Sequence, residues 1–241
     1  MTWEHVPPKS CNNAGAIKTK DIFEIKDNKY HYESQNGIKY RTICGDCNNS
    51  ILGACSDVAF KNLYEQCVFF LDSLSCLSEE QYIEIDIYNI VKSVFGKFLA
   101  MSKEFVNSEI DNEMRNFILH DIIPTSLHLY FRIYPYASII QCRNCLSSNV
   151  TNPNDYTTKG LLSLLYYYPF AFILSTETEN IHNIDFLEHL DVKNHKSTIC
   201  LTPQSAYYPN NGSLLEHDWP INIENKIVFM SDDTNKLISR R

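Results

Sequence analysis

Hydrophobic residues recur at helical spacing in three segments of the chain. The first predicted helix begins at Asp57, whose side chain suits an N-cap. Its apolar positions follow the helical period and are Val58, Phe60, Leu63, Tyr64, Cys67, Val68 and Leu71. A second helix is predicted over residues 88–106, with an apolar face of Ile90, Val91, Val94, Phe95, Phe98 and Met101. A third helix is predicted over residues 112–122, because Pro124 would end it.

Other segments have the alternation or the composition of strands. Residues 29–43 predict a β-hairpin, because Asn36-Gly37 suits the two positive-φ positions of a type I′ turn. Segments rich in Tyr, Phe and Ile predict further strands at 127–140, 164–174, 198–202 and 221–230. Residues 1–28 contain several turn formers and are predicted to be mostly irregular.

The order of these elements predicts an α+β fold in two parts. Residues 1–60 would form a small head of two strands and a helix, and residues 61–241 a larger domain. That domain is predicted to be helical over 61–124 and mainly β over 125–241. A chain of 241 residues with 44% hydrophobic side chains is long enough to bury a sizeable core.

Charge is distributed unevenly along the chain. The formal net charge is −8, yet residues 1–50 carry 7 basic and 6 acidic side chains. The first part could therefore approach a polyanion, whereas the acidic remainder would bind DNA poorly. The sequence has neither a signal peptide nor an apolar run long enough to cross a membrane. We therefore expect a cytoplasmic protein with reduced thiols and no membrane partner.

Two short motifs carry the candidate chemistry. Glu4 and His5 are adjacent near the start, and Cys44 and Cys47 form a Cys-x-x-Cys pair that Asn48 follows. A carboxylate is a hard oxygen ligand for a divalent cation, and a neutral imidazole beside it can take a proton from water. Two thiolates at this spacing are a common half of a tetrahedral zinc site. The motifs therefore predict two metals, one for catalysis and one for structure.

These motifs, in this order, resemble the HNH (ββα-metal) nuclease family over about residues 1–60. The resemblance implies an HNH-like head in which His5 is the general base that activates water. It also implies that Glu4 and Asn48 hold the catalytic cation, Mg²⁺ or Mn²⁺. Asn49 and His31 remain open as alternatives to Asn48.

The structural zinc needs more ligands than the Cys44–Cys47 pair provides. Family members with four zinc cysteines usually have a second pair upstream of the acidic-His motif, where this sequence has only three residues. Cys142 and Cys145 form another Cys-x-x-Cys pair, so Zn²⁺ held by all four cysteines is one expectation. The other is that Cys142 and Cys145 pack as small buried residues.

The resemblance predicts a metal-dependent endonuclease that hydrolyses phosphodiester bonds in DNA. Lys9 and Arg41 are the nearest basic side chains that could hold adjacent phosphates. Because the chain is acidic, its own affinity for DNA should be weak, which favours a protein partner or a homo-oligomer. Family habit suggests an effector in a bacterial defence system. The alternative is a catalytically inactive, zinc-stabilised binding or scaffold protein.

Overall fold

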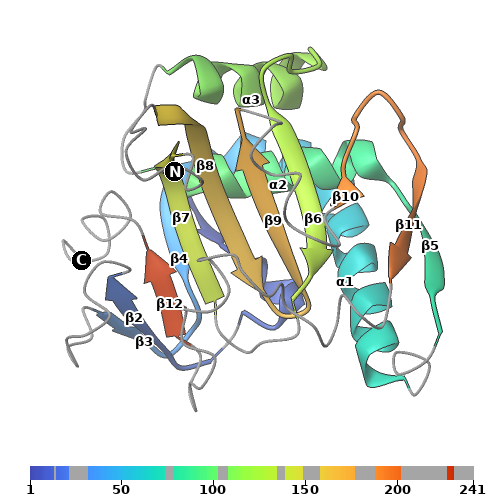
Figure 1. The fold of residues 1–241 in the computed structure, drawn as a ribbon. Coiled ribbons are helices and arrows are strands. Elements are labelled where there is room, and N and C mark those ends of the chain that lie inside the picture. The colour runs from blue at the N-terminus through green and yellow to red at the C-terminus, as the bar shows by residue number, and fades with distance from the viewer. Residues whose placement is uncertain are drawn as a thin grey trace.

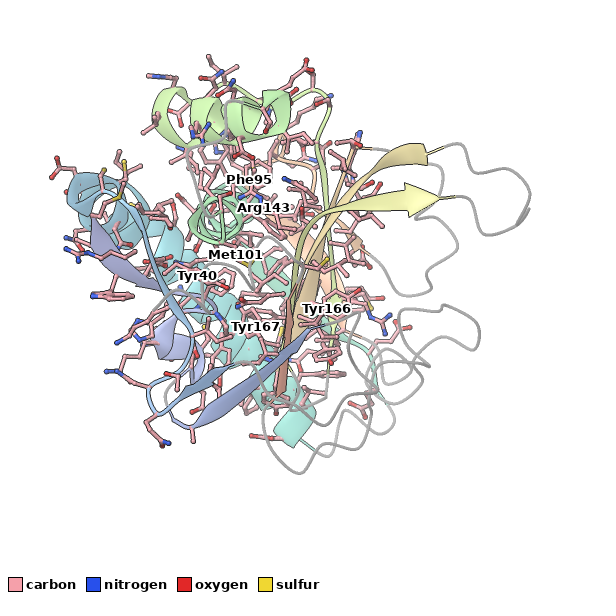
Figure 2. All side chains as sticks on the ribbon, turned by 90° about the vertical axis from the view of Figure 1, so that its left-hand side faces the viewer. Tyr40, Phe95, Met101, Arg143, Tyr166 and Tyr167 are labelled. Carbon is pink, nitrogen blue, oxygen red and sulfur yellow. The ribbon has the colours of Figure 1, made fainter. Side chains whose placement is uncertain are left out.

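The structure is a computed structural model, and it describes residues 1–13, 15–21, 32–73, 79–102, 108–134, 139–148, 158–176, 188–201 and 227–230. Within these ranges the protein mixes helices and sheets, which confirms the predicted α+β class. The helices lie on one face of a large sheet (Figures 1 and 2). Two further sheets have two strands each.

Over the described residues, the large sheet has eight strands in the order β10-β6-β9-β8-β7-β12-β2-β3. Neighbouring strands are antiparallel, except that β12 runs parallel to both β2 and β7. Every residue of β9 is buried, so this strand is a continuous apolar run without alternation. The strands are β2 (Ile17–Asp21), β3 (Tyr32–Ser34), β6 (His128–Ile133), β7 (Ile139–Ser148), β8 (Thr158–Tyr167), β9 (Phe170–Ser175), β10 (Glu188–His189) and β12 (Ile227–Met230).

Two of the predicted strand segments each contain two strands. The segment 164–174 turns at Tyr168 and Pro169, and β8 and β9 pair on either side of this turn. The apolar run continues through the turn, which is why composition alone did not reveal it. Likewise, the segment 127–140 includes β6 and the start of β7. The prediction at 198–202 is confirmed by β11 (Ser197–Leu201), which pairs with the unpredicted β5 (Gln81–Ile85).

Apolar periodicity located the three helices, but the second, α2, ends at Ala100 and not at the predicted residue 106. All six residues of the predicted apolar face of α2 are buried, and Asp86 caps this helix by accepting a hydrogen bond from the Asn89 N–H. Ser108 caps α3 in the same way through the Asp111 N–H. None of the helices in the described ranges is long and apolar enough to cross a lipid bilayer. The helices are the 3₁₀-helix η1 (Lys9–Cys11), the π-helix η2 (Cys47–Ser56), α1 (Asp57–Asp72), α2 (Ile87–Ala100) and α3 (Glu109–His120).

The α-helix α1 begins at Asp57, but the prediction that Asp57 is its N-cap is wrong. Helical backbone is already present in η2 and runs directly into α1. The Asp57 carboxylate does not cap a helix and instead accepts hydrogen bonds from Ser93 Oγ at 2.7 Å and Lys97 Nζ at 3.0 Å. Asp57 therefore joins the first helical segment to α2.

The predicted hairpin over 29–43 is also wrong. Strand β4 (Lys39–Ile43) pairs antiparallel with β1 (Thr2–His5), and β3 pairs with β2. Of the Asn36-Gly37 pair, only Gly37 has a positive φ, so a type I′ turn does not form. Strands β1 and β2 both lie in the part of the chain that was predicted to be irregular.

Asn13 explains why the chain does not fold back after β3. Its side-chain amide donates hydrogen bonds to the Pro7 and Ile38 carbonyls, and its Oδ1 accepts one from the Ile38 N–H. The Gly37 N–H donates to the Gly15 carbonyl at 2.9 Å. The loop before β4 is therefore fixed against the loop that follows β1.

The head and the rest of the chain share one core. A single cluster of buried apolar side chains extends from Val6 to Leu201. Tyr40 of β4 donates a hydrogen bond to Gln141 Oε1 of β7 at 2.6 Å, and Gln141 Nε2 donates to the Val6 carbonyl. The expected boundary at residue 60 lies inside α1.

Candidate functional site

Glu4 lies in a cluster of three charged side chains, of which Glu4 and Lys97 are buried and Asp57 is partly exposed. The Glu4 carboxylate, on β1, is 7% exposed and accepts a hydrogen bond from the ammonium of Lys97. Lys97 comes from α2 and is fully buried, and its Nζ also contacts Asp57 Oδ1 at 3.0 Å. Two carboxylates and one ammonium leave the cluster with one surplus negative charge, which favours binding of an additional proton there.

The pKa shifts in this cluster have two opposing causes. Burial raises the pKa of the Glu4 carboxyl, and the Lys97 ammonium only partly offsets that effect. Burial alone would lower the pKa of Lys97, but the Glu4 and Asp57 carboxylates outweigh it and raise the pKa. Lys97 is therefore held in its charged form.

Asn48 lies beside Glu4. It is in the first turn of η2, and its Nδ2 donates hydrogen bonds to Thr2 Oγ1 at 3.2 Å and to the Trp3 carbonyl at 3.3 Å. A side-chain hydrogen bond from Asn48 also lowers the pKa of Glu4 slightly. The start of the helix is thus fixed against β1.

His5 follows Glu4 on β1, so its side chain leaves the opposite face of the strand. The half-buried ring hydrogen-bonds the Asn36 backbone, while its buried Nε2 has no hydrogen-bond partner. Burial, together with the nearby charges of Lys39 and Lys9, lowers the pKa of His5. The imidazole is therefore neutral near pH 7.

The residues predicted to hold a divalent cation do not fit one in this arrangement. The Glu4 carboxylate already accepts the Lys97 ammonium, which would repel a second cation at that position. Lys97 has no exposed surface, so it cannot move aside without opening the core. His5 faces away from this cluster. The protein's own ammonium takes the place of the cation that the sequence suggested.

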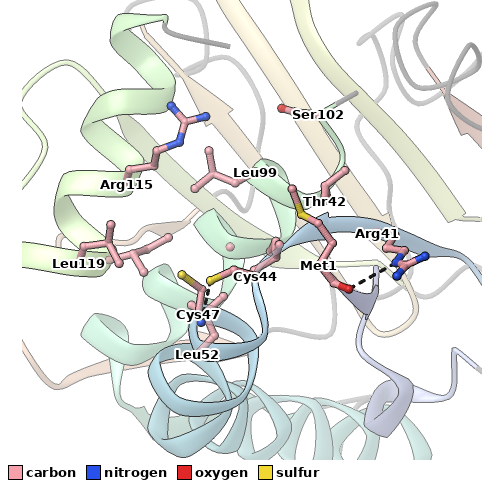
Figure 3. A pocket seen from close by; sticks show the side chains of 13 residues that line it. Met1, Arg41, Thr42, Cys44, Cys47, Leu52, Leu99, Ser102, Arg115 and Leu119 are labelled. Carbon is pink, nitrogen blue, oxygen red and sulfur yellow. Dashed lines mark hydrogen bonds between the residues drawn. The ribbon is translucent and has the colours of Figure 1, made fainter. Parts of the chain in front are cut away.

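Cys44 and Cys47 lie together at the start of the helical segment, where Figure 3 shows their sulfur atoms side by side. The Cys47 N–H donates to Cys44 Sγ at 3.2 Å. Hydrogen bonding from the Cys47 thiol and N–H lowers the pKa of Cys44. Burial raises the pKa of Cys47 to about 11. The two thiols therefore differ in acidity, and Cys44 is the more acidic.

The four-cysteine zinc site is not assembled among the described residues. Cys142 is buried on β7 and is disulfide-bonded, so it has no free thiolate to offer a metal. The side chain of Cys145 lies outside the described set. Within the described ranges, no group of three or more His, Cys, Asp or Glu side chains could hold a metal ion.

The remaining candidates lie around the edge of the head. Lys9 is exposed in η1 near His5, and Asn49 is exposed in η2. Arg41 is exposed on β4, and its Nε donates to the Met1 carbonyl at 3.3 Å. His31 lies outside the described residues.

Sequence reasoning missed Lys97, although a signal was present. Lys97 follows Val94 by three residues and precedes Met101 by four, so it lies within the apolar stripe of α2. A single Lys in such a stripe indicates a buried, paired ammonium. No protein family, curated protein or solved structure matches this chain. The interpretation of the site therefore rests on its residues.

Proposed function

We propose that this protein hydrolyses phosphodiester bonds in DNA, with an HNH-type head formed by the strands β1 and β4 and the helix after them. The observation that carries the proposal is the contact of Asn48 with β1. It joins the acidic-His strand to the first turn of the helix after the cysteine pair, in the order of the ββα-metal motif. Antiparallel pairing of β1 with β4 supports the same arrangement.

His5 is the proposed general base. A base must be neutral to accept a proton, and the lowered pKa of His5 provides that form near pH 7. The unpartnered Nε2 carries the lone pair, and because this atom is buried, a water must gain access to it when DNA binds. The hydrogen bond to the Asn36 backbone orients the ring. Lys9 and Arg41 would bind neighbouring phosphates.

The Lys97 ammonium already pairs with the Glu4 carboxylate. The proposal therefore assigns no step to the divalent cation that the resemblance implies. The same observation favours a second candidate function, a binding or scaffold protein with an inactive head. A net charge of −8 weakens the binding of DNA by this chain alone, for either candidate function. This favours a protein partner or a homo-oligomer. A role as a bacterial defence effector is part of the nuclease proposal.

Cleavage of supercoiled plasmid DNA, with Mg²⁺ or Mn²⁺ added, tests the proposal. We expect nicking by the wild type and loss of nicking in His5→Ala. His120→Ala removes an exposed imidazole at the end of α3 and should leave nicking unchanged. A wild type that cleaves nothing with either ion would favour the scaffold function, and full cleavage by His5→Ala would exclude His5 as the base.

A further inference from the structure

The Cys44–Cys47 pair has the geometry of a reactive dithiol. Both cysteines are free thiols, and Cys44 is exposed whereas Cys47 is half-buried. Two residues, Gly45 and Asp46, separate them along the first turn of helical backbone, and the Cys47 N–H donates to Cys44 Sγ at 3.2 Å. This spacing brings two sulfurs close enough for a disulfide without moving the backbone far.

A cavity of about 370 Å³ adjoins this dithiol, and both cysteines line it (Figure 3). Most of its other lining is apolar, and its two charged lining residues are both arginines. Arg115 already pairs with Asp111 at 3.4 Å, whereas Arg41 is exposed on β4 and donates to the neutral Met1 carbonyl. The cavity therefore suits a ligand with an apolar part and a negative charge. Its apolar lining includes Met1, Leu52, Leu99, Ile118 and Leu119.

We propose that Cys44 and Cys47 form a reversible dithiol–disulfide couple that exchanges with an anionic disulfide bound in this cavity. The zinc expected from the sequence would require further ligands, but Cys142 is itself disulfide-bonded. Among the described residues, the other free cysteines do not form a Cys-x-x-Cys pair: Cys55 is exposed, Cys200 is half-buried, and Cys11 and Cys67 are buried. This inference stands apart from the proposed nuclease function.

The exchange has two balanced steps. Cys44, as the more exposed sulfur, attacks one sulfur of the bound disulfide as a thiolate. A mixed disulfide forms, the ligand's S–S bond breaks, and one ligand thiolate leaves. Cys47 then attacks Cys44 Sγ, which closes the Cys44–Cys47 disulfide and releases the second ligand thiolate. The ligand disulfide gains two electrons, the two cysteines lose them, and their two protons pass to the two released thiolates.

Oxidised glutathione, an anionic disulfide, is the probe for the test. The reduced full-length protein is incubated in glutathione buffers of graded redox ratio, then alkylated and mapped by mass spectrometry. We expect loss of two alkylatable thiols and one peptide-mapped Cys44–Cys47 disulfide. In Cys47→Ser the exchange should stop after the first step, which leaves a stable mixed disulfide on Cys44. Cys44→Ser should form no mixed disulfide. Cys55→Ser is the matched control and should behave as the wild type does.

Arg41→Gln tests the role of the cavity, because it removes a charge but no thiol. It should slow oxidation by glutathione disulfide more than oxidation by cystamine, a cationic disulfide; equal slowing would contradict a charged binding site. Failure of the wild type to form the Cys44–Cys47 disulfide would overturn the couple. So would stoichiometric zinc that protects both thiols until a chelator removes it. None of these outcomes depends on plasmid cleavage, which His5→Ala tests separately.

Discussion

At the residue scale, Lys97 is the group that allows the Glu4 carboxylate to be buried in the head, beside the partly exposed carboxylate of Asp57. Glu4 and Asp57 both contact its ammonium, and Ser93 supplies a further donor to Asp57. Burying an ion pair is costly, yet removing one partner costs more because the other charge is left uncompensated. The three groups therefore stabilise the fold as a unit.

Substitution of Lys97 by Met tests this dependence. We expect Lys97→Met to lower the free energy of unfolding by about 3–5 kcal/mol, measured by urea titration, because Glu4 and Asp57 lose their counter-charge. Adding Glu4→Gln should recover part of that loss. The control is Lys92→Met on the same helix, whose partner Asp121 is largely exposed, and it should cost less than about 1 kcal/mol. Equal losses in the two single variants would contradict the role of the cluster.

His5 gives the head a pH dependence. Its pKa is lowered in the folded chain, so the unfolded chain binds the proton more readily. The stability that neutral His5 contributes is therefore complete above the unfolded pKa of about 6.5, and it falls as the pH decreases below that value. His5→Gln should flatten this slope in urea titrations between about pH 7 and pH 5. His120→Gln, which changes an exposed residue, should keep the same slope of stability against pH. An unchanged slope in His5→Gln would show that His5 does not cause it.

At the element scale, the sequence predicted helices better than strand pairing, for a physical reason. The face of α2 repeats every few residues, so a short window contains the whole signal. The pairing of β1 with β4 depends on contacts between distant segments, which local alternation does not encode. The Asn36-Gly37 dipeptide misled the prediction because Asn13, far away in sequence, satisfies the backbone at Ile38.

Gly37 tests the importance of that loop. Its φ is +65°, and an added Cβ would lie 2.2 Å from Asn13 Oδ1. Gly37→Ala should therefore lower the free energy of unfolding by about 1–3 kcal/mol for the backbone strain, with the clash adding to it. Gly45→Ala is the control, because its Cβ would make only an ordinary 3.4 Å contact with Thr2. Thermal unfolding of both variants would measure the difference, and similar losses would show that the Asn13 contact is unimportant.

At the scale of the whole molecule, the sequence located the candidate residues but not their surroundings. Glu4 and Asn48 were predicted to hold one cation, and in the structure a hydrogen bond joins their side chains. The partner of Glu4 is Lys97, which is more than ninety positions away along the chain. A motif specifies which residues carry chemistry, but burial and long-range partners decide whether an atom is available. The disulfide at Cys142 shows the same limit for the zinc prediction.

The shared core predicts that the head does not unfold independently. Gln141 joins β7 to Tyr40 and Val6, and the apolar cluster is continuous between the two parts. We expect one urea transition. In a Trp219→Phe variant, in which Trp3 on β1 is the remaining tryptophan, its fluorescence and the far-ultraviolet circular dichroism should give the same midpoint. Gln141→Leu should lower the free energy of unfolding by about 1–3 kcal/mol, because the Val6 carbonyl and the Tyr40 hydroxyl lose the hydrogen bonds to Gln141. The urea midpoint should decrease accordingly. An earlier transition reported by Trp3 alone would instead make the head a separate folding unit.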